Sequence, residues 1–303
     1  MPRPFITFLI LSVIANAAFS QDMPLTQVLT PDENWQLLGE GYKFTEGPAA
    51  DAHGNVYFTD VPESRIYKID TDGKVTLFAK DTAKTNGLMF GPDGRLYGCR
   101  NGDKQIVRYA ADGSFESVAD GVDSNDIAVG SDGAIYFTDP PNQQVWHIAP
   151  KGKARVVAKG FRPNGIILWP GEGTLVVTDS EQPHLWTFRI EADGGLKFKE
   201  RYYMPLRMLP GAELPGSDGM AVDDRGRLYV ATYAGIQMFD PTGRMGGVIL
   251  KPQNRFLSNV TFGGPKFDFL YVTCSDKVYR RKTKPTGTPY FLRNAASKKK
   301  TNK

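Results

Sequence analysis

Six side chains with oxygen donors recur at nearly regular intervals along the chain. Each lies 11 or 12 residues before the central residue of a short apolar strand pattern such as "NVYFTD". Four of them are followed directly by glycine. The six residues are Glu46, Asn86, Asn125, Asn164, Asp218 and Asn259. Carboxylate and amide oxygens, with some negative charge and no sulfur or imidazole, suit a hard divalent cation.

Turn chemistry is the competing explanation for these residues. A single Asn-Gly or Asp-Gly pair is an ordinary turn signal. Six in phase are harder to attribute to turns, and glutamate is not a favoured turn residue, which makes Glu46 the most informative member. We therefore predict one bound divalent cation. Ca²⁺ is favoured because a flexible, asparagine-rich oxygen cage suits its larger shell, while Mg²⁺, Mn²⁺ and Zn²⁺ remain open.

The strand pattern that follows these residues indicates the fold. Its central residues are Tyr57, Tyr97, Tyr136, Val176, Tyr229 and Tyr271, separated by 40, 39, 40, 53 and 42 residues. Further short strands and Gly turns complete each unit, as in "SRIYKID", "TDG" and "KVTLFAK". Six such units predict an all-β, six-bladed β-propeller with four antiparallel strands per blade. A stacked solenoid is the alternative, but the Asp-Gly hairpin turns favour antiparallel blades.

A propeller would bring the six oxygen-bearing residues together. Equivalent positions at the start of each innermost strand surround the central channel at one end, so we expect the metal site in that channel. The last unit lacks a fourth strand, and we expect "NWQLLGE" at 34–40 to supply it and close the ring. The extra length at 198–214 predicts a long loop on the face that carries the site.

The ends of the chain predict how it is processed. Arg3, an apolar run over 5–18 and small residues before a cleavage point after Ser20 indicate a signal peptide over 1–20, with an uncleaved anchor as the alternative. We expect a linker over 21–33, the propeller over 34–285 and a basic, disordered tail over 286–303. The mature protein is predicted to be secreted or periplasmic, monomeric, and without a membrane span. A net charge of only +4 argues against a nucleic-acid partner.

Together these motifs resemble the regucalcin/gluconolactonase family of six-bladed propellers over roughly residues 40–282. The motifs that carry the resemblance are "TEGP" (45–48), "SNDIAVGSDGAIYFTD" (124–139), "RPNGIILWPGEGTLVVTDS" (162–180) and "PGSDGMAVDDRGRLYVAT" (215–232). The resemblance implies a channel-bound divalent metal, often calcium, held by Glu46, Asn164 and Asp218, with Asn125 in or beside the shell. It also implies metal-assisted hydrolysis of a lactone, with Asp218 as the candidate for activating water.

The expected substrate contacts include one departure from that family. Sugar-lactone members tend to carry an arginine just before the Asn-Asp of the third unit, where this chain has Asp123 and Ser124. The acidic neighbour could favour a neutral or cationic substrate. His184, in "DSEQPHLW", could also face the site. The expected substrate-binding residues are Asn86, Asn125, Asp123, His184 and Asn259.

Two functions from different classes remain open at this point. The first is an exported hydrolase, a lactonase or esterase that opens a small-molecule lactone or ester. The second is a non-catalytic propeller that binds a ligand or protein around a structural calcium, because fold alone does not decide function. A strictosidine-synthase-like enzyme would not predict the Glu46, Asn164 and Asp218 set. No Gly-x-Ser-x-Gly elbow is present, which disfavours a serine triad.

Overall fold

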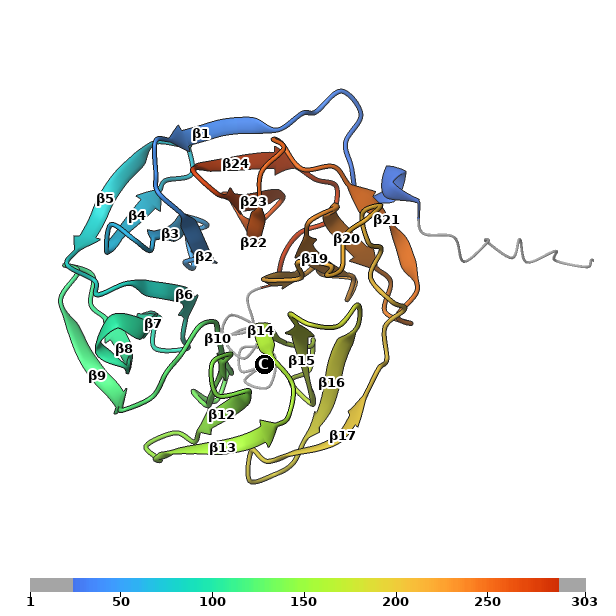
Figure 1. The fold of residues 1–303 in the computed structure, drawn as a ribbon. Coiled ribbons are helices and arrows are strands. Elements are labelled where there is room, and N and C mark those ends of the chain that lie inside the picture. The colour runs from blue at the N-terminus through green and yellow to red at the C-terminus, as the bar shows by residue number, and fades with distance from the viewer. Residues whose placement is uncertain (1–23, 289–303) are drawn as a thin grey trace, which may run out of the picture.

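The repeated strands and glycine turns form six four-stranded antiparallel sheets around a central axis (Figure 1). This arrangement, seen in a computed structural model that describes residues 24–288, confirms the predicted six-bladed propeller. The predicted signal peptide over 1–20 lies outside the described residues, as does all of the predicted tail beyond residue 288. No helix within 24–288 is long and apolar enough to cross a membrane.

The sheets follow one another in chain order, and each begins at the axis and ends at the rim. Blade 1 comprises β2 (Thr45–Ala50), β3 (Val56–Asp60), β4 (Arg65–Ile69) and β5 (Val75–Lys80). Blade 2 comprises β6 (Thr85–Phe90), β7 (Leu96–Arg100), β8 (Gln105–Tyr109) and β9 (Phe115–Asp120). Blade 3 comprises β10 (Ile127–Val129), β11 (Ile135–Asp139), β12 (Gln144–Ile148) and β13 (Ala154–Lys159). Short 3-10 turns occur at Leu25–Gln27 (η1) and Asn101–Asp103 (η2).

The second half of the chain repeats the arrangement. Blade 4 comprises β14 (Pro163–Leu168), β15 (Thr174–Asp179), β16 (Leu185–Ile190) and β17 (Leu196–Glu200). Blade 5 comprises β18 (Met220–Val222), β19 (Leu228–Thr232), β20 (Gly235–Phe239) and β21 (Met245–Ile249). Blade 6 comprises β22 (Leu257–Gly263), β23 (Phe269–Cys274), β24 (Lys277–Lys282) and β1 (Gln36–Glu40). We call the face on which the innermost strands begin the site face.

The core lies between neighbouring blades. The second strand of every blade is almost entirely buried, because both of its faces pack against adjacent sheets. The outermost strands are less buried, and β9 and β17 are largely exposed. The hydrophobic clusters each combine side chains from at least two blades. Cys99 on β7 and Cys274 on β23 are buried and unbonded, as expected for equivalent strands of two blades separated by blade 1.

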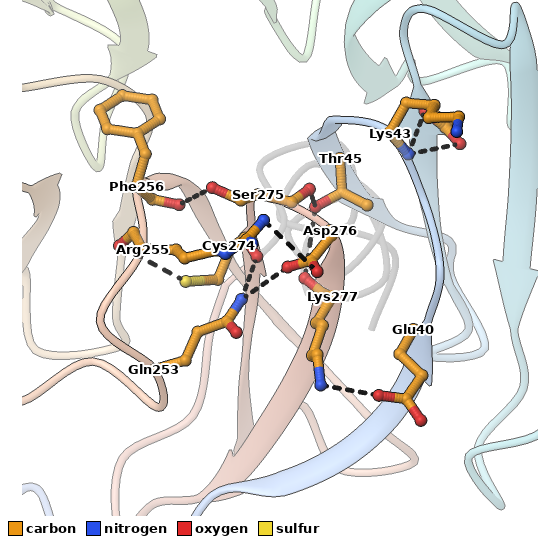
Figure 2. Close-up of polar contacts among 11 residues, drawn as sticks. Glu40, Lys43, Thr45, Gln253, Arg255, Phe256, Cys274, Ser275, Asp276 and Lys277 are labelled. Atoms are coloured by element: carbon orange, nitrogen blue, oxygen red, sulfur yellow. Dashed lines mark hydrogen bonds and ion pairs between the residues drawn. The ribbon is translucent and has the colours of Figure 1, made fainter.

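The ring closes through strands from both ends of the chain. β1 pairs antiparallel with β24 as the fourth strand of blade 6, which confirms the prediction for residues 34–40. The ammonium group of Lys277 lies 2.7 Å from a carboxylate oxygen of Glu40 in this pair (Figure 2). The Thr45 N–H, at the start of blade 1, donates to the Ser275 carbonyl of blade 6 at 2.7 Å. Closure therefore pairs the outer edge of β24, which would otherwise be open.

The extra length between blades 4 and 5 lies in a linker over 201–219. The predicted loop began too early, because residues 198–200 complete strand β17. The Met204 N–H donates to the Gly243 carbonyl on the face opposite the site, and the Leu206 N–H donates to the Pro183 carbonyl on the site face, each at 2.8 Å. The linker thus crosses from one face to the other and leads directly into Asp218.

Glycines allow the innermost strands to approach one another at the axis. A Cβ atom at Gly165 on β14 would collide with the backbone carbonyl of Asp218 in the next blade. At Gly47, whose φ is +51°, a Cβ would meet the Asn86 carbonyl in the same way. The glycine that follows four of the six oxygen-bearing residues is therefore a packing requirement of the axis.

Replacing Gly165 by Ala should destabilise the fold, because backbone atoms of blade 5 cannot yield to the added methyl group. We expect the free energy of unfolding to fall by about 2–3 kcal/mol, the upper part of the range typical of overpacking, as measured by denaturant titration. Gly173→Ala in the same blade is the matched control, since a Cβ there has no neighbour within 4 Å. Equal stability of the two variants would contradict this account.

Candidate functional site

The six oxygen-bearing residues singled out from the sequence all lie at the site-face end of the innermost strands. Glu46, Asn86 and Asn164 are the second residues of β2, β6 and β14, and Asn259 is the third residue of β22. Asn125 and Asp218 lie two residues before β10 and β18. The innermost strands surround the axis (Figure 1), so the periodicity of the sequence places these residues in one ring.

Hydrogen bonds between neighbouring blades hold the backbone of the ring in position. The Thr59 hydroxyl of blade 1 donates to the Asn86 carbonyl of blade 2 at 3.2 Å. The Thr138 hydroxyl of blade 3 donates to the Asn164 carbonyl of blade 4 at 2.6 Å. In blades 1 and 3, the threonine of the Thr-Asp strand ending therefore fixes the ring residue of the following blade. Cys99 occupies the same position in blade 2, where its pKa is raised by burial and by the charge of Asp126.

Polar contacts bring part of the ring together around Glu46. The Asn259 side-chain amide donates to a Glu46 carboxylate oxygen at 3.2 Å. Glu46 also accepts the Gly47 N–H at 2.8 Å. Asp218 interacts with both Glu46 and Asn164 through side-chain hydrogen bonding. The side-chain oxygen Oδ1 of Asn164 is buried and has no hydrogen-bond partner among residues 24–288.

Asp126 is a third acid at the axis, and the sequence analysis did not select it. It is buried, its carboxylate accepts the Asn259 amide at 3.4 Å, and it also accepts the Ile127 N–H at 3.0 Å. A Cβ at Gly87 would collide with its side chain, so blade 2 leaves room for it. The signal was present in the sequence, because Asp126 occupies the position that is glycine in four of the six units.

Burial without a counter-charge dominates the electrostatics of these acids. Burial raises the pKa of Asp126 to about 7, against the opposing hydrogen bonds from Ile127 and Asn259. Burial, then the charge of Asp126, raises the pKa of Glu46. The pKa of Asp218 is also well above its ordinary value, because of burial and the nearby charges of Glu46 and Asp126. Neighbouring buried carboxyls of this kind retain protons that isolated acids would release.

The channel beyond the ring is apolar. A cavity of about 110 Å³ extends from Asp126 and Asn259 between the innermost strands. The residues Gly287 and Thr288, which follow the last blade, line its opposite end. The apolar side chains along its wall include Leu88, Ile127, Ile166, Met220 and Val260. An apolar wall lowers the local dielectric response, so charges at the ring interact more strongly there than they would in water.

The remaining predicted substrate residues differ in their surroundings. Asn86 and Asn125 are partly buried, and within residues 24–288 their side-chain amides have no hydrogen-bond partner. Asp123 lies 3.4 Å from the Lys104 ammonium group and accepts the Asn142 amide at 3.3 Å. The two asparagines thus offer free amides beside the ring, whereas the Asp123 carboxylate already has two partners.

His184, the histidine that could face the site, is buried and packed. Its ring is only 6% exposed and packs edge to face on Trp186, with the centroids 4.6 Å apart. Burial, then the charge of Arg201, lowers its pKa, and its Nε2 atom has no hydrogen-bond partner in the described part of the chain. Its surroundings are therefore those of a neutral, packed imidazole at the edge of blade 4.

Comparison with known proteins matches this architecture to one family. The SMP-30/Gluconolactonase/LRE-like region model matches residues 44–276. A gluconolactonase from Zymomonas mobilis subsp. mobilis is 28% identical over 310 aligned residues, which cover 87% of this chain and 84% of that protein.

Solved structures agree with that match. A gluconolactonase from Xanthomonas campestris is 27% identical, with a TM-score of 0.75 over 86% of this chain and 92% of that chain. Regucalcin from Agrobacterium tumefaciens, described as a calcium-binding protein, shares the fold at 19% identity, with a TM-score of 0.72 over 84% of this chain and 96% of that one. From its blades, its axial ring and these matches, the chain belongs to the SMP-30/gluconolactonase/LRE-like family.

Proposed function

We propose that this chain is an exported, metal-dependent hydrolase that opens a small lactone or ester at the site-face end of its channel. The observation that carries the proposal is the buried cluster of oxygen donors formed by Glu46, Asp218 and Asn164. The gluconolactonase relatives support a lactone as the substrate class. Export rests on the N-terminal sequence.

The ring residues fit a divalent cation on chemical grounds. Two buried carboxyls side by side raise each other's pKa, and a bound cation would remove the cost of ionising both. The buried Oδ1 of Asn164, which has no hydrogen-bond partner among the described residues, is a further oxygen ligand. Within residues 24–288 no three His, Cys, Asp or Glu side chains alone are grouped to hold a metal, so an ion here would need asparagine oxygens too.

The donor set favours calcium. Carboxylate and amide oxygens without nitrogen or sulfur ligands suit Ca²⁺ better than Zn²⁺. The calcium-binding regucalcin of the same fold supports this choice. We propose that Glu46, Asn164 and Asp218 would hold the ion, with Asn125 beside them. When bound, the ion would polarise the substrate carbonyl and stabilise the negative charge that develops on its oxygen.

The chain's own residues would position the reactants and move the proton. Asp218 is the proposed base: it would take a proton from water as the water oxygen bonds to the carbonyl carbon. The bond from that carbon to the ring or ester oxygen then breaks, and the departing oxygen takes up the proton. Asp126, with a pKa near 7, could hold a proton at neutral pH, and Asn259 keeps it in contact with Glu46.

A substrate and metal panel tests the proposed activity directly. Purified protein is freed of metal with EDTA and assayed on a set of lactones and aryl esters with Ca²⁺, Mg²⁺, Mn²⁺ or Zn²⁺. We expect turnover of at least one lactone and the highest rate with Ca²⁺. If no compound is hydrolysed with any metal, the non-catalytic binding propeller replaces the hydrolase.

Replacing Asp218 by Asn should remove turnover and leave the fold intact. The amide keeps the shape of the side chain and relieves a buried like-charge contact, but it cannot accept the proton. We expect kcat/KM to fall at least about a hundredfold, the scale of general base catalysis, with an unchanged circular dichroism spectrum. Asp224→Asn, an exposed acid in the same blade, is the matched control. Full activity in Asp218→Asn would exclude Asp218 as the base.

Calcium should stabilise the protein more at pH 8 than at pH 5. The pKa values of Glu46, Asp126 and Asp218 are raised in the folded state, so the folded protein keeps protons that the unfolded chain releases above about pH 4. The metal-free protein therefore loses stability as the pH rises toward 7. The same protons compete with the ion at pH 5. At pH 8 and a hundredfold excess over Kd, calcium should add about 2.7 kcal/mol to the free energy of unfolding.

Denaturant titrations with calcium or EDTA at the two pH values measure this effect. Glu46→Gln should lose most of the calcium increment. Glu63→Gln, an exposed acid of the same blade, should keep it. A wild-type protein that is equally stable with calcium and with EDTA at pH 8 would contradict the proposed ion site.

A further inference from the structure

Aromatic side chains precede two of the ring residues on the site face. Phe44 lies two residues before Glu46, and Phe256 lies three residues before Asn259. Their rings stack across the junction of blades 1 and 6, with the centroids 6.1 Å apart and the planes inclined by 11°. Both side chains are only partly buried. An aromatic surface therefore stands beside the Glu46 and Asn259 pair at the entrance.

A third ring continues this surface into blade 5. Tyr233 packs edge to face on Phe256, with the centroids 5.5 Å apart, and is 37% exposed. It also covers Gly216, where a Cβ would collide with the Tyr233 ring, and Gly216 lies two residues before Asp218. We call Phe44, Tyr233 and Phe256 the aromatic wall. Each member is tied to the segment that leads into one of the acidic or amide ring residues.

Ser275 holds two members of the aromatic wall in place. Its carbonyl accepts both the N–H and the hydroxyl of Thr45, at 2.7 and 3.0 Å, and Thr45 directly follows Phe44. Its hydroxyl donates to the Phe256 carbonyl at 3.1 Å. Figure 2 shows these contacts meeting at Ser275, with the Phe256 ring pointing away from them. One turn residue thus sets the positions of both stacked rings.

The chain just before Phe256 is held as firmly. The Gln253 amide donates to the Cys274 carbonyl at 2.6 Å and to Asp276 at 3.1 Å (Figure 2). Arg255 forms an ion pair with Asp276 at 3.5 Å. A partly exposed aromatic ring on a segment anchored this closely is ready to receive a ligand with little loss of conformational entropy.

The opposite side of the entrance has a different chemistry. Asn86 and Asn125 of blades 2 and 3 have no side-chain partner among residues 24–288, so their amides can bind polar substrate atoms. The Asp123 carboxylate is already engaged by Lys104 and Asn142. The entrance therefore presents amides on blades 2 and 3 and aromatic rings on blades 5, 6 and 1.

We propose that the aromatic wall is a subsite for an aromatic or other apolar substituent of the substrate. The inference rests on the proposed hydrolase and makes its substrate an aryl- or alkyl-substituted lactone or ester rather than a polyhydroxylated sugar lactone. When an apolar group covers the exposed ring faces, the apolar surface of the group and of the rings is removed from water, which favours binding. An aromatic group adds stacked or edge-to-face contacts. The hydroxyls of a sugar would find no hydrogen-bond partner on Phe44 or Phe256.

A matched pair of lactones tests the selectivity. Dihydrocoumarin is a six-membered lactone fused to a benzene ring, and δ-valerolactone is the same lactone without it. We expect Phe256→Ala and Tyr233→Ala each to lower the ratio of kcat/KM for dihydrocoumarin to that for δ-valerolactone by about tenfold. Phe198→Ala is the control, because Phe198 is 59% exposed on β17 and packs under Arg189. A ratio unchanged from wild type in both wall variants overturns the proposal.

A binding measurement separates this subsite from the proposed reaction. The lactam analogue of dihydrocoumarin, with N–H in place of the ester oxygen, is titrated calorimetrically into the calcium-loaded protein. A roughly tenfold weaker Kd in Tyr233→Ala supports the subsite even if no lactone is hydrolysed. If δ-valerolactone is hydrolysed but the wall variants do not change the Kd of the lactam, the proposed hydrolase is supported and the proposed subsite is contradicted. Absence of binding to wild type also removes it.

The variants must be folded for these comparisons to count. Tyr233 is at the surface, so its replacement by Ala leaves no buried void. Phe256→Leu keeps most of the apolar volume and loses only the ring. If Phe256→Ala melts early, Phe256→Leu replaces it, with the same expected fall in the substrate ratio. A ratio unchanged in both Phe256→Leu and Tyr233→Ala overturns the proposal.

Discussion

The close approach of six innermost strands at one axis determines what this protein can hold there. Glycines such as Gly165 and Gly47 allow backbone to meet backbone, and the residues just before them are then forced into one ring. Acids in such a ring are deprived of water and lie near one another, which raises the pKa of Glu46, Asp126 and Asp218. The packing of the axis therefore supports the proposed cation site.

Ring closure and site geometry depend on the same junction. β1 completes blade 6 by pairing with β24, so the two ends of the propeller are fixed in one sheet. The Ser275 turn then joins that sheet to the start of blade 1, directly beside Glu46. Because the same turn also holds Phe256, the closing contacts position both Glu46, a proposed metal ligand, and part of the entrance. Loosening this junction would therefore disturb fold and site together.

The entrance is asymmetric although the fold is nearly sixfold. The repeat supplies equivalent positions in every blade, but the side chains at those positions differ. Blades 2 and 3 place amides beside the axis, blade 3 adds the acid Asp126, and blades 5, 6 and 1 place aromatic rings above the ring residues. A substrate that fits this entrance would have a polar end and an apolar end. The repeat thus builds the scaffold, and departures from it carry the chemistry.

The sequence alone determined the blade count, the strand order and the ring of oxygen donors, because hydrophobic alternation and turn chemistry are local and repeat every 40 residues or so. It also indicated that 34–40 closes the ring, because the last unit lacks a fourth strand and this segment precedes the first unit. It did not show that Asp126 reaches the axis, that His184 packs on Trp186, or that residues 198–200 extend a strand. Only the tertiary structure decided which side chains meet, and so which pKa values shift and where the aromatic wall forms. The side-chain contacts, the pKa shifts and the aromatic wall all depend on residues of different blades that are distant in sequence. Local sequence patterns carry no information about such contacts.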